Sequence, residues 1–559
     1  MKQTKRVRLA IAVLAALASV SLARTVAATE PAGGTAETAE LQLVEATIPQ
    51  LQQAMQSGLL TAEQLVRLYR ARIAAFDQAG PKVNAFLYLN PNAEAAARQL
   101  DARRRPGFTP GPLYGIPVLL KDNVDAADMP TTAGSLALAG SLPPDDAFLT
   151  RRLREAGAIL LGKATLTEFA NFLAIGMPTG YSSLGGFGRN PYDPRPLPGG
   201  DGRPVLQTGG SSSGPGIGVS ANLVTVAVGT ETSGSILSPA SSNGVVGLKP
   251  TLGLVSRDGI LPITADQDTA GPIARTVTDA ALLLGVLAGF DLADPATVPC
   301  LLPHRCFRDY TPFLNPQALR GARIAVVTPI PANRANLMNA AIDVLYAQGA
   351  EVELLPEPFP AQLGTCVSVP PPTGCSTVLL YGLKRDLNAY LTATPGAPRK
   401  TIAEIIAFNQ THLPPPKYGQ ALFGAAEQLD ITSGSPDTLR YLADLAEDRA
   451  RSRGALDAVF NGPDGIRGTA DDFVAILSSA NNFAAAPAKA GYPSITVPGG
   501  FVPPTAPIAH PFPSGVTFTG RAFSEPILLG LAYAFEQATH HRRPPESTPP
   551  LPTDRVSRP

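Results

Sequence analysis

Serine and glycine gather in the stretch "GGSSSGPGIGVSANLVTVAVGTETSGSILSPAS", which runs from Gly209 to Ser241. Its middle, "VTVAVG", is a short apolar run typical of a buried strand, and the Gly/Ser clusters on both sides of this run are predicted turns. Successive backbone N–H groups in such turns can hold a developing oxyanion, and a serine in the same turn can act as a nucleophile. The stretch therefore predicts acyl-transfer chemistry and is not a flexible linker.

A serine nucleophile needs a base, and the sequence offers two kinds of candidate, a histidine or a lysine. The run Gly210 to Gly214 matches G-x-S-x-G, which suggests an α/β-hydrolase with Ser212 as nucleophile and a later histidine as base. That signal is weak, because the preceding strand is poor and the histidines lie in Pro-rich or terminal stretches: His304, His412, His510, His540 and His541. The other base is a lysine, since burial disfavours the charged amine and lowers its pKa. The candidate lysines are Lys121, Lys163 and Lys249. A lysine that ends a strand is usually a solvated side chain without a catalytic role, and this alternative applies to each of the three.

The elements that must position these groups alternate between helix and strand signals. "TAEQLVRLYRARIAAF" opens with a capping box, Thr61 to Gln64, and "TVTDAALLLGVLAG" opens with another, Thr276 to Asp279, so both predict helices. Short apolar runs predict buried strands of an α/β sheet in "GIPVLLKDN", "AILLGKAT", "VTVAVGT", "GARIAVV" and "AEVELLP". Polar groups in such a sheet belong beyond the carboxyl ends of the strands. Lys121, Lys163 and the cluster from Thr230 to Ser235 all lie at such ends.

The stretches "GIPVLLKDN", "GGSSSGPGIGVSANLVTVAVGTETSGSI" and "NGVVGLKPTLGLVSRDGI" resemble the core of the amidase signature family. The sequence "GTETSGSI" together with "QDTAGPIARTVTDAA" is most similar to the peptide amidase branch. The resemblance extends over most of the chain, with the core motifs at about residues 111–290. It implies a single large α/β domain over about residues 29–545, with a mixed central β-sheet flanked by α-helices.

The resemblance also implies a Ser-cisSer-Lys triad that hydrolyses amides. Matched by motif, Ser235 is the nucleophile, Ser211 the cis bridging serine and Lys121 the ultimate base. The backbone amides of Thr232, Ser233, Gly234 and Ser235 form the implied oxyanion hole. Without the resemblance, Ser211 and Ser235 would be read as turn or cap serines.

Two positions depart from the family pattern. Ser233 stands where the family commonly has Gly or Asp, which places a second hydroxyl beside the implied oxyanion hole. The insertion-like "YDPRPLPGGDGRPVLQ" before Ser211 is expected to form a loop near the substrate entrance.

Composition excludes some classes of protein and partner. The chain has 559 residues, 44% of them apolar, which is enough for a large core. Because 45 basic and 45 acidic residues cancel and no long basic run occurs, a nucleic-acid partner is not indicated. No metal or organic cofactor is required by the implied mechanism. The segment "NGPDGIRGTADD" carries carboxylates, but it lacks the register and closing Glu of an EF-hand and is predicted to be a surface turn rather than a calcium loop.

The N-terminus has the build of a secretory signal peptide, predicted over residues 1–28. Lys2, Lys5, Arg6 and Arg8 precede an apolar run from Leu9 to Ala23, and small residues follow, with cleavage after Ala28 or after Ala23. The run is shorter than the roughly 20 residues of a membrane span, so an uncleaved anchor is the lesser alternative. The mature protein is therefore expected in the periplasm or outside the cell, without stable membrane association.

Cysteine usage fits an oxidising compartment. The four cysteines favour the two local disulfides Cys300 to Cys306 and Cys366 to Cys375, although other pairings and a metal site stay open. A Pro-rich disordered tail is predicted over residues 546–559.

Three functions remain from the sequence. The first is an exported amidase acting on C-terminal peptide amides or on related aliphatic or aryl amides. The second is one component of a glutamine-dependent amidotransferase, against which the signal peptide argues. The third is a noncatalytic binding protein that keeps the fold, which the presence of Lys121, Ser211 and Ser235 disfavours. The partner expected for the first function is a small-molecule or peptide amide substrate.

Overall fold

The computed structural model describes residues 40–105, 110–355, 376–412 and 416–557. The predicted signal peptide and the cysteine pair Cys366 and Cys375 lie outside these ranges. Residues from Glu40 onwards belong to one compact unit. No helix in the described ranges combines the length and apolarity needed to cross a membrane.

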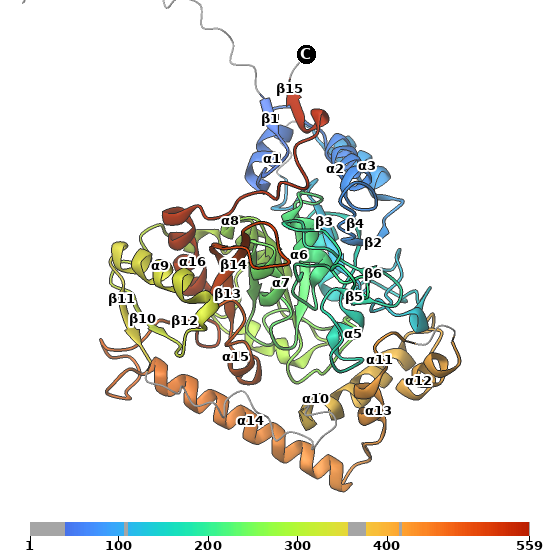
Figure 1. Cartoon of the computed structure of the whole chain (residues 1–559), viewed down its shortest axis with the longest axis vertical. Helices are drawn as coiled ribbons and strands as arrows, with labels where there is room; N and C mark the ends of the chain where they lie inside the picture. Colours follow the sequence, from blue (N-terminus) through green and yellow to red (C-terminus); the bar gives the residue numbers. More distant parts are fainter. Residues whose placement is uncertain (1–39, 106–109, 356–375, 413–415, 558–559) are drawn as a thin grey trace, which may run out of the picture. The chain divides into compact units, whose positions relative to one another are not determined.

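A mixed sheet runs through this unit (Figure 1). Within the described residues it has eleven strands, in the spatial order β11 (Glu351–Leu354), β10 (Arg323–Val326), β12 (Ala475–Ser479), β14 (Phe512–Thr519), β13 (Ser494–Val502), β8 (Val246–Lys249), β9 (Thr269–Ala274), β7 (Val226–Glu231), β3 (Pro117–Lys121), β4 (Ile159–Ala164) and β2 (Phe86–Leu89). The strands β7, β3 and β4 run parallel to one another, and every residue of these three strands is buried. Continuous apolar runs such as "PVLL" suit strands that are covered on both faces.

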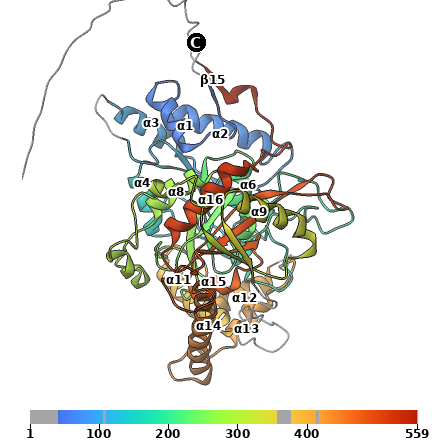
Figure 2. The ribbon, with the colours of Figure 1, turned by 90° about the vertical axis from the view of Figure 1, so that its left-hand side faces the viewer.

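Helices cover the sheet. α6 (Ser213–Ser220) and α7 (Leu237–Ser242) pack on each other and on the central strands, while α4 (Phe148–Glu155), α8 (Val277–Leu287), α9 (Ala335–Ala347) and α16 (Glu525–Thr539) form a further layer, in which α8 and α16 lie side by side (Figure 2). The capping threonines predicted from the sequence are present: Thr61 closes a complete capping box, and Thr276 accepts the N–H of Asp279.

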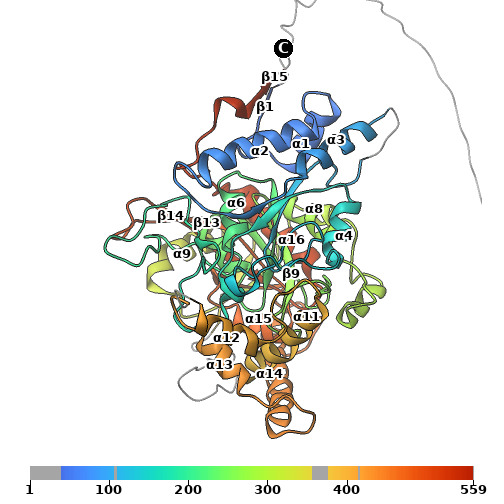
Figure 3. The same ribbon diagram turned by 90° about the vertical axis from the view of Figure 1, so that its right-hand side faces the viewer.

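The remaining helices form two groups, which lie above and below the sheet in the views of Figures 1 and 3. On one side are α1 (Ile48–Gln56), α2 (Ala62–Phe76) and α3 (Ala93–Arg103). On the other are α10 (Thr377–Gly382), α11 (Asn388–Ala393), α12 (Ile402–Thr411), α13 (Ala421–Glu427) and the long α14 (Pro436–Phe460), against which α15 (Ala485–Ala490) packs. The short α5 (Glu168–Asn171) and the ribbon of β5 (Tyr181–Ser182) and β6 (Gly186–Phe187) lie between β4 and α6 in the chain.

The segment predicted to be a disordered tail takes part in the fold instead. β15 (Arg555–Ser557) pairs antiparallel with β1 (Glu40–Gln42), as Figure 1 shows beside the C-terminus. Asp554 forms an ion pair with Arg72 of α2 at 2.5 Å, and both side chains are fully buried. Main-chain pairing and this buried ion pair hold the segment, so its high proline content was a misleading signal. Residues 558–559 lie outside the described ranges.

The disulfide between Cys300 and Cys306 is present, as predicted. It closes a short loop that follows α8.

Candidate active site

Lys121 is the last residue of β3, between the parallel neighbours β7 and β4, and its side chain is fully buried. Its ammonium nitrogen Nζ lies 2.8 Å from Ser211 Oγ and 2.8 Å from Thr230 Oγ1. It also lies 3.3 Å from the Thr230 carbonyl oxygen. The structure thus brings together two residues of the predicted triad that are 90 positions apart in the chain.

Ser211 follows a cis peptide bond from Gly210 and precedes α6. Its approach to Lys121 requires the two preceding glycines. Gly209 has a φ of +64°, and a Cβ atom there would lie 2.6 Å from the Ser238 carbonyl oxygen. A Cβ on Gly210 would lie 2.6 Å from Thr167 Oγ1. Any larger residue would push this turn away from its neighbours.

Ser235 lies in the turn between β7 and α7, and it is 8% exposed. Its carbonyl oxygen accepts the N–H of Ser212 at 3.1 Å, so the turn that carries Ser235 contacts the turn that carries Ser211. Ser235 is therefore nearly buried but still reachable from outside.

Glu231, at the end of β7, shapes the turn of Ser235. One carboxylate oxygen accepts the N–H of Gly234 at 2.7 Å, and the other accepts the N–H groups of Ile236 and Leu237 at 2.7 and 3.1 Å. This role of Glu231 was not predicted from the sequence. The signal that could have found it is an acidic residue that ends a buried strand directly before a Gly/Ser turn.

The four predicted oxyanion donors divide into two groups. The N–H of Gly234 is bound to Glu231, whereas the N–H groups of Thr232, Ser233 and Ser235 have no acceptor among the described residues. Three amides of the turn are therefore left for an external acceptor such as a substrate oxygen. Ser233, the departure from the family pattern, is exposed to solvent.

Burial lowers the pKa of Lys121 to about 7, and the negative charges of Asp268 and Glu231 oppose this shift. Asp268 is itself buried, which raises its pKa to about 7. Its carboxylate accepts the Thr232 hydroxyl at 2.5 Å and the N–H groups of Ile263 and Thr264 at 2.8 and 3.0 Å. Near neutral pH a substantial fraction of Lys121 is therefore the neutral amine, which can accept a proton.

The competing candidates have other partners. Lys163 Nζ lies 3.3 Å from Asp122 Oδ1, and Lys249 Nζ donates to the Pro250 carbonyl oxygen at 3.1 Å. Ser212, the alternative nucleophile of the G-x-S-x-G pattern, is fully buried and donates its hydroxyl to the Thr230 carbonyl oxygen at 3.0 Å. Among the three lysines, only Lys121 contacts a serine hydroxyl within the described residues.

The segment Asn461 to Asp472 is a surface turn whose carboxylates accept its own N–H groups. In the part of the chain that the structure describes, no group of His, Cys, Asp and Glu is arranged to hold a metal ion.

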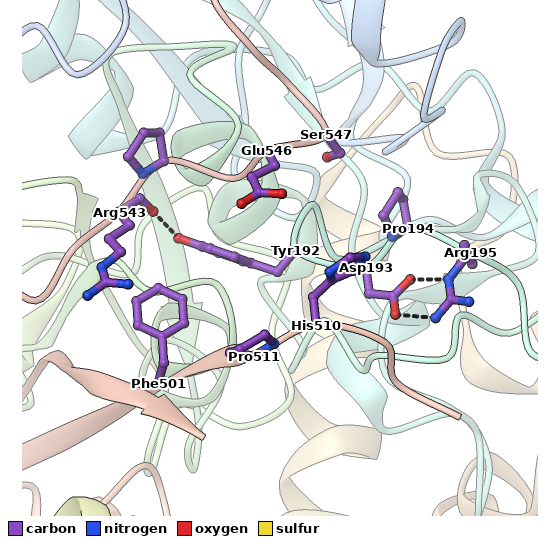
Figure 4. Close-up of a pocket in the computed structure, with 11 residues that line it drawn as sticks. Tyr192, Asp193, Pro194, Arg195, Phe501, His510, Pro511, Arg543, Glu546 and Ser547 are labelled. Atoms are coloured by element: carbon purple, nitrogen blue, oxygen red, sulfur yellow. Dashed lines mark hydrogen bonds and ion pairs between the residues drawn. The ribbon is translucent and has the colours of Figure 1, made fainter. Parts of the chain in front are cut away.

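The insertion-like loop lines two pockets. Its start, from Tyr192 to Arg195, lines a cavity of about 420 Å³ together with residues of the β13–β14 loop and the C-terminal segment (Figure 4). None of the predicted site residues lies there. Its end, residues 205–207, lines a second cavity of about 660 Å³ together with Gly209 and Ser238, which flank the two serine turns.

Comparison with known proteins agrees with this geometry. A family model described as Amidase matches residues 64–364. The structure of a native peptide amidase from Stenotrophomonas maltophilia is 41% identical with a TM-score of 0.78, and the match covers 90% of this chain and 99% of that one. A probable amidase of Arabidopsis thaliana is 37% identical over 90% of this chain and 91% of its own length. One component of the glutamyl-tRNA(Gln) amidotransferase of Chloroflexus aurantiacus is 31% identical over 90% of this chain and 99% of its own length.

The fold is a mixed sheet flanked by helices, a buried lysine contacts a serine hydroxyl, and amidases match over most of the chain. The chain therefore belongs to the amidase family, has the amidase signature fold and is an amide-hydrolysing enzyme.

Proposed function

We propose that this enzyme hydrolyses C-terminal peptide amides through an acyl-enzyme formed on Ser235, with Ser211 and Lys121 as the proton relay. The observation that carries the mechanism is the 2.8 Å contact between Lys121 Nζ and Ser211 Oγ, made by a lysine whose burial lowers its pKa to about 7.

In the proposed first half-reaction, Ser235 Oγ attacks the carbonyl carbon of the amide. Its proton passes to Ser211 Oγ, while the proton of Ser211 passes to the neutral amine of Lys121. The negative charge on the substrate oxygen is held by the unpaired N–H groups of the turn. The same relay then returns a proton to the leaving nitrogen, the carbon–nitrogen bond breaks, and ammonia departs.

In the second half-reaction, water attacks the acyl-enzyme. Its proton enters the relay through Ser211, and the collapse of the tetrahedral intermediate returns a proton to Ser235 Oγ. Free carboxylic acid and the starting enzyme result.

We favour peptide amides as substrates because the chain is more similar to a peptide amidase than to an amidotransferase component. The peptide amidase matches at 41% identity over 90% of the chain, whereas the amidotransferase component matches at 31% over the same share. The predicted signal peptide also argues against the amidotransferase function, because charged tRNA is cytoplasmic.

The test is release of ammonia from a panel of peptide C-terminal amides and simple aliphatic and aryl amides, with the parent enzyme and the Ser235→Ala variant side by side. We expect release from peptide amides that disappears in the variant. Release from small amides alone would overturn the peptide specificity. Equal rates in both proteins would overturn the role of Ser235, and no release from any amide of the panel would overturn the proposed substrate class.

We further propose that the chain is exported. The basic and apolar pattern of residues 1–28 and the Cys300–Cys306 disulfide support this proposal. Mass spectrometry of the protein isolated from the producing cells would test it. We expect a mature N-terminus after Ala23 or Ala28 in an extracytoplasmic fraction, and an intact N-terminus in the cytoplasm would overturn the proposal.

A further inference from the structure

The cavity of about 660 Å³ borders the two serine turns, although none of the predicted site residues lines it. Gly209 lies two positions before Ser211 and Ser238 lies three positions after Ser235, and both line the cavity. Thr179 and Asn481 line it as well. A Cβ on Gly210 would lie 3.1 Å from Thr179 Cβ, and a Cβ on Gly234 would lie 3.2 Å from Asn481 Nδ2. A group held in this cavity would therefore lie beside the turns that carry both serines.

The charge in the lining of the cavity is positive and comes from one residue. Arg334, directly before α9, is the one ionisable residue in its lining, which otherwise consists of apolar residues, hydroxyls and amides. The other polar groups include the Ser238 hydroxyl and the Asn481 amide, which can donate hydrogen bonds. The lining contains no carboxylate that would compete with an anionic ligand.

Arg334 has no anionic partner of its own in the described part of the chain. Its guanidinium lies 5.6 Å from the centre of the Phe512 ring, and its Nη1 atom is buried without an acceptor. Arg195, in the neighbouring cavity, shows the contrast, because it forms an ion pair with Asp193 at 2.7 Å. A partly desolvated guanidinium without a counterion gains free energy when a carboxylate binds to it bidentately.

We propose that this cavity is a subsite for a carboxylate on the acyl portion of the substrate, and that Arg334 binds it. The inference rests on the proposed peptide amidase function. Hydrolysis of a C-terminal amide releases ammonia, which carries no carboxylate, so the anionic group must belong to the acyl side. The preferred substrates are then peptide amides with an acidic side chain, Asp or Glu, close to the scissile amide.

The test compares kcat/KM for N-acetylated tripeptide amides that carry Glu or the isosteric Gln at each of the three positions in turn. In the parent enzyme we expect a preference for Glu over Gln of about tenfold or more at one position. Arg334→Met is expected to reduce the rate for the Glu peptide to that of the Gln peptide and to leave the Gln peptide unchanged. Arg334→Glu is expected to reverse the preference toward Lys.

Arg195→Met is the matched control, because it removes an arginine that already has a partner, and the preference for Glu should survive it. Equal rates for Glu and Gln peptides in the parent, or a preference that persists in Arg334→Met, would overturn the subsite while leaving the peptide amidase function standing. A preference for a carboxylate on the leaving amine would overturn its assignment to the acyl side.

If the parent hydrolyses no peptide amide, the proposed function fails and the subsite is tested by binding alone. Calorimetry with the Ser235→Ala variant and the Glu and Gln tripeptide amides then measures affinity without turnover. Tighter binding of the Glu peptide that is lost in Ser235→Ala/Arg334→Met supports the carboxylate subsite, and equal affinity overturns it.

Discussion

Two lysines near the ends of neighbouring parallel strands have opposite surroundings. Lys121 of β3 contacts the hydroxyls of Ser211 and Thr230. Lys163 of β4 donates to the Pro130 carbonyl oxygen and the Thr131 hydroxyl, and it also lies 3.3 Å from the carboxylate of Asp122. Both lysine side chains are fully buried. The difference is therefore one of partner rather than depth.

Strand register explains the difference. At the end of the β3–β4 pair Lys163 lies opposite Leu120, and Lys121 lies opposite Ala164. Because successive side chains of a strand point to opposite faces, the offset of one residue sends the two lysines to opposite faces of the sheet. One face holds the serine turns, and the other holds the carboxylate. Burial with neutral oxygens leaves Lys121 able to act as a base, while Lys163 neutralises a buried anion.

The largest effect is expected from Lys121→Met. This variant removes the proposed terminal base, so kcat for amide hydrolysis should fall by about 10³ or more. Steady-state ammonia release measures the loss, with Lys163→Met as the matched control. If Lys121→Met keeps more than a tenth of the parent kcat, Lys121 is not the base.

Lys163→Met is expected to act on stability. It leaves Asp122 buried without its cation, and breaking such a pair costs on the order of 3–5 kcal/mol. Thermal unfolding should show a clear drop in Tm, part of which the double variant Lys163→Met/Asp122→Asn restores by removing the stranded charge. Activity per folded molecule should remain within about tenfold of the parent. An unchanged Tm would mean that the ion pair contributes nothing.

Thr230→Val tests whether the hydroxyl of Thr230 positions the amine of Lys121. Thr230 Oγ1 accepts from Lys121 Nζ at 2.8 Å and from Asn123 Nδ2 at 3.1 Å, so its loss frees the amine to rotate away from Ser211. We expect kcat to fall about tenfold with little change in KM, the size of one ordinary hydrogen bond. Thr230→Ser keeps the hydroxyl and should restore most of the activity. A KM effect without a kcat effect would contradict this positioning role.

The smallest effect concerns pH. Because Lys121 must be neutral to accept a proton and its pKa is about 7, kcat/KM should rise with pH up to about 7 and then level off. The negative charge of Asp268 raises the pKa of Lys121. Asp268→Asn should therefore shift the rising limb to lower pH, by less than about one unit. A shift to higher pH would contradict the assignment of this limb to Lys121.

Much of the local structure could be predicted from the sequence. The capping boxes at Thr61 and Thr276 mark helix starts because a side chain satisfies N–H groups only a few residues away. The disulfide between Cys300 and Cys306 was predictable for a similar reason, because its two cysteines are only 6 positions apart in the chain. The glycines before Ser211 marked a turn, although the buried helix α6 that follows them was not predicted, because its residues are buried all round and show no amphipathic period.

Long-range contacts could not be predicted. The role of Glu231 depends on how the chain folds back after β7, and the order of the C-terminal segment depends on Arg72, 482 positions away from Asp554. The proline content of the C-terminal segment suggested disorder. That prediction failed because proline content reflects local conformation and does not reveal a distant partner such as Arg72.

The sequence by itself determined the α/β class, two capped helices, five of the strands, and the motifs whose resemblance points to an amidase. Only the tertiary structure decided which buried lysine contacts a serine hydroxyl and which contacts a carboxylate, and that Arg334 lines a cavity beside the serine turns. The physical reason is range: caps and turns are set by neighbouring residues, whereas burial, register and hydrogen-bond partners arise from segments that meet only when the sheet assembles.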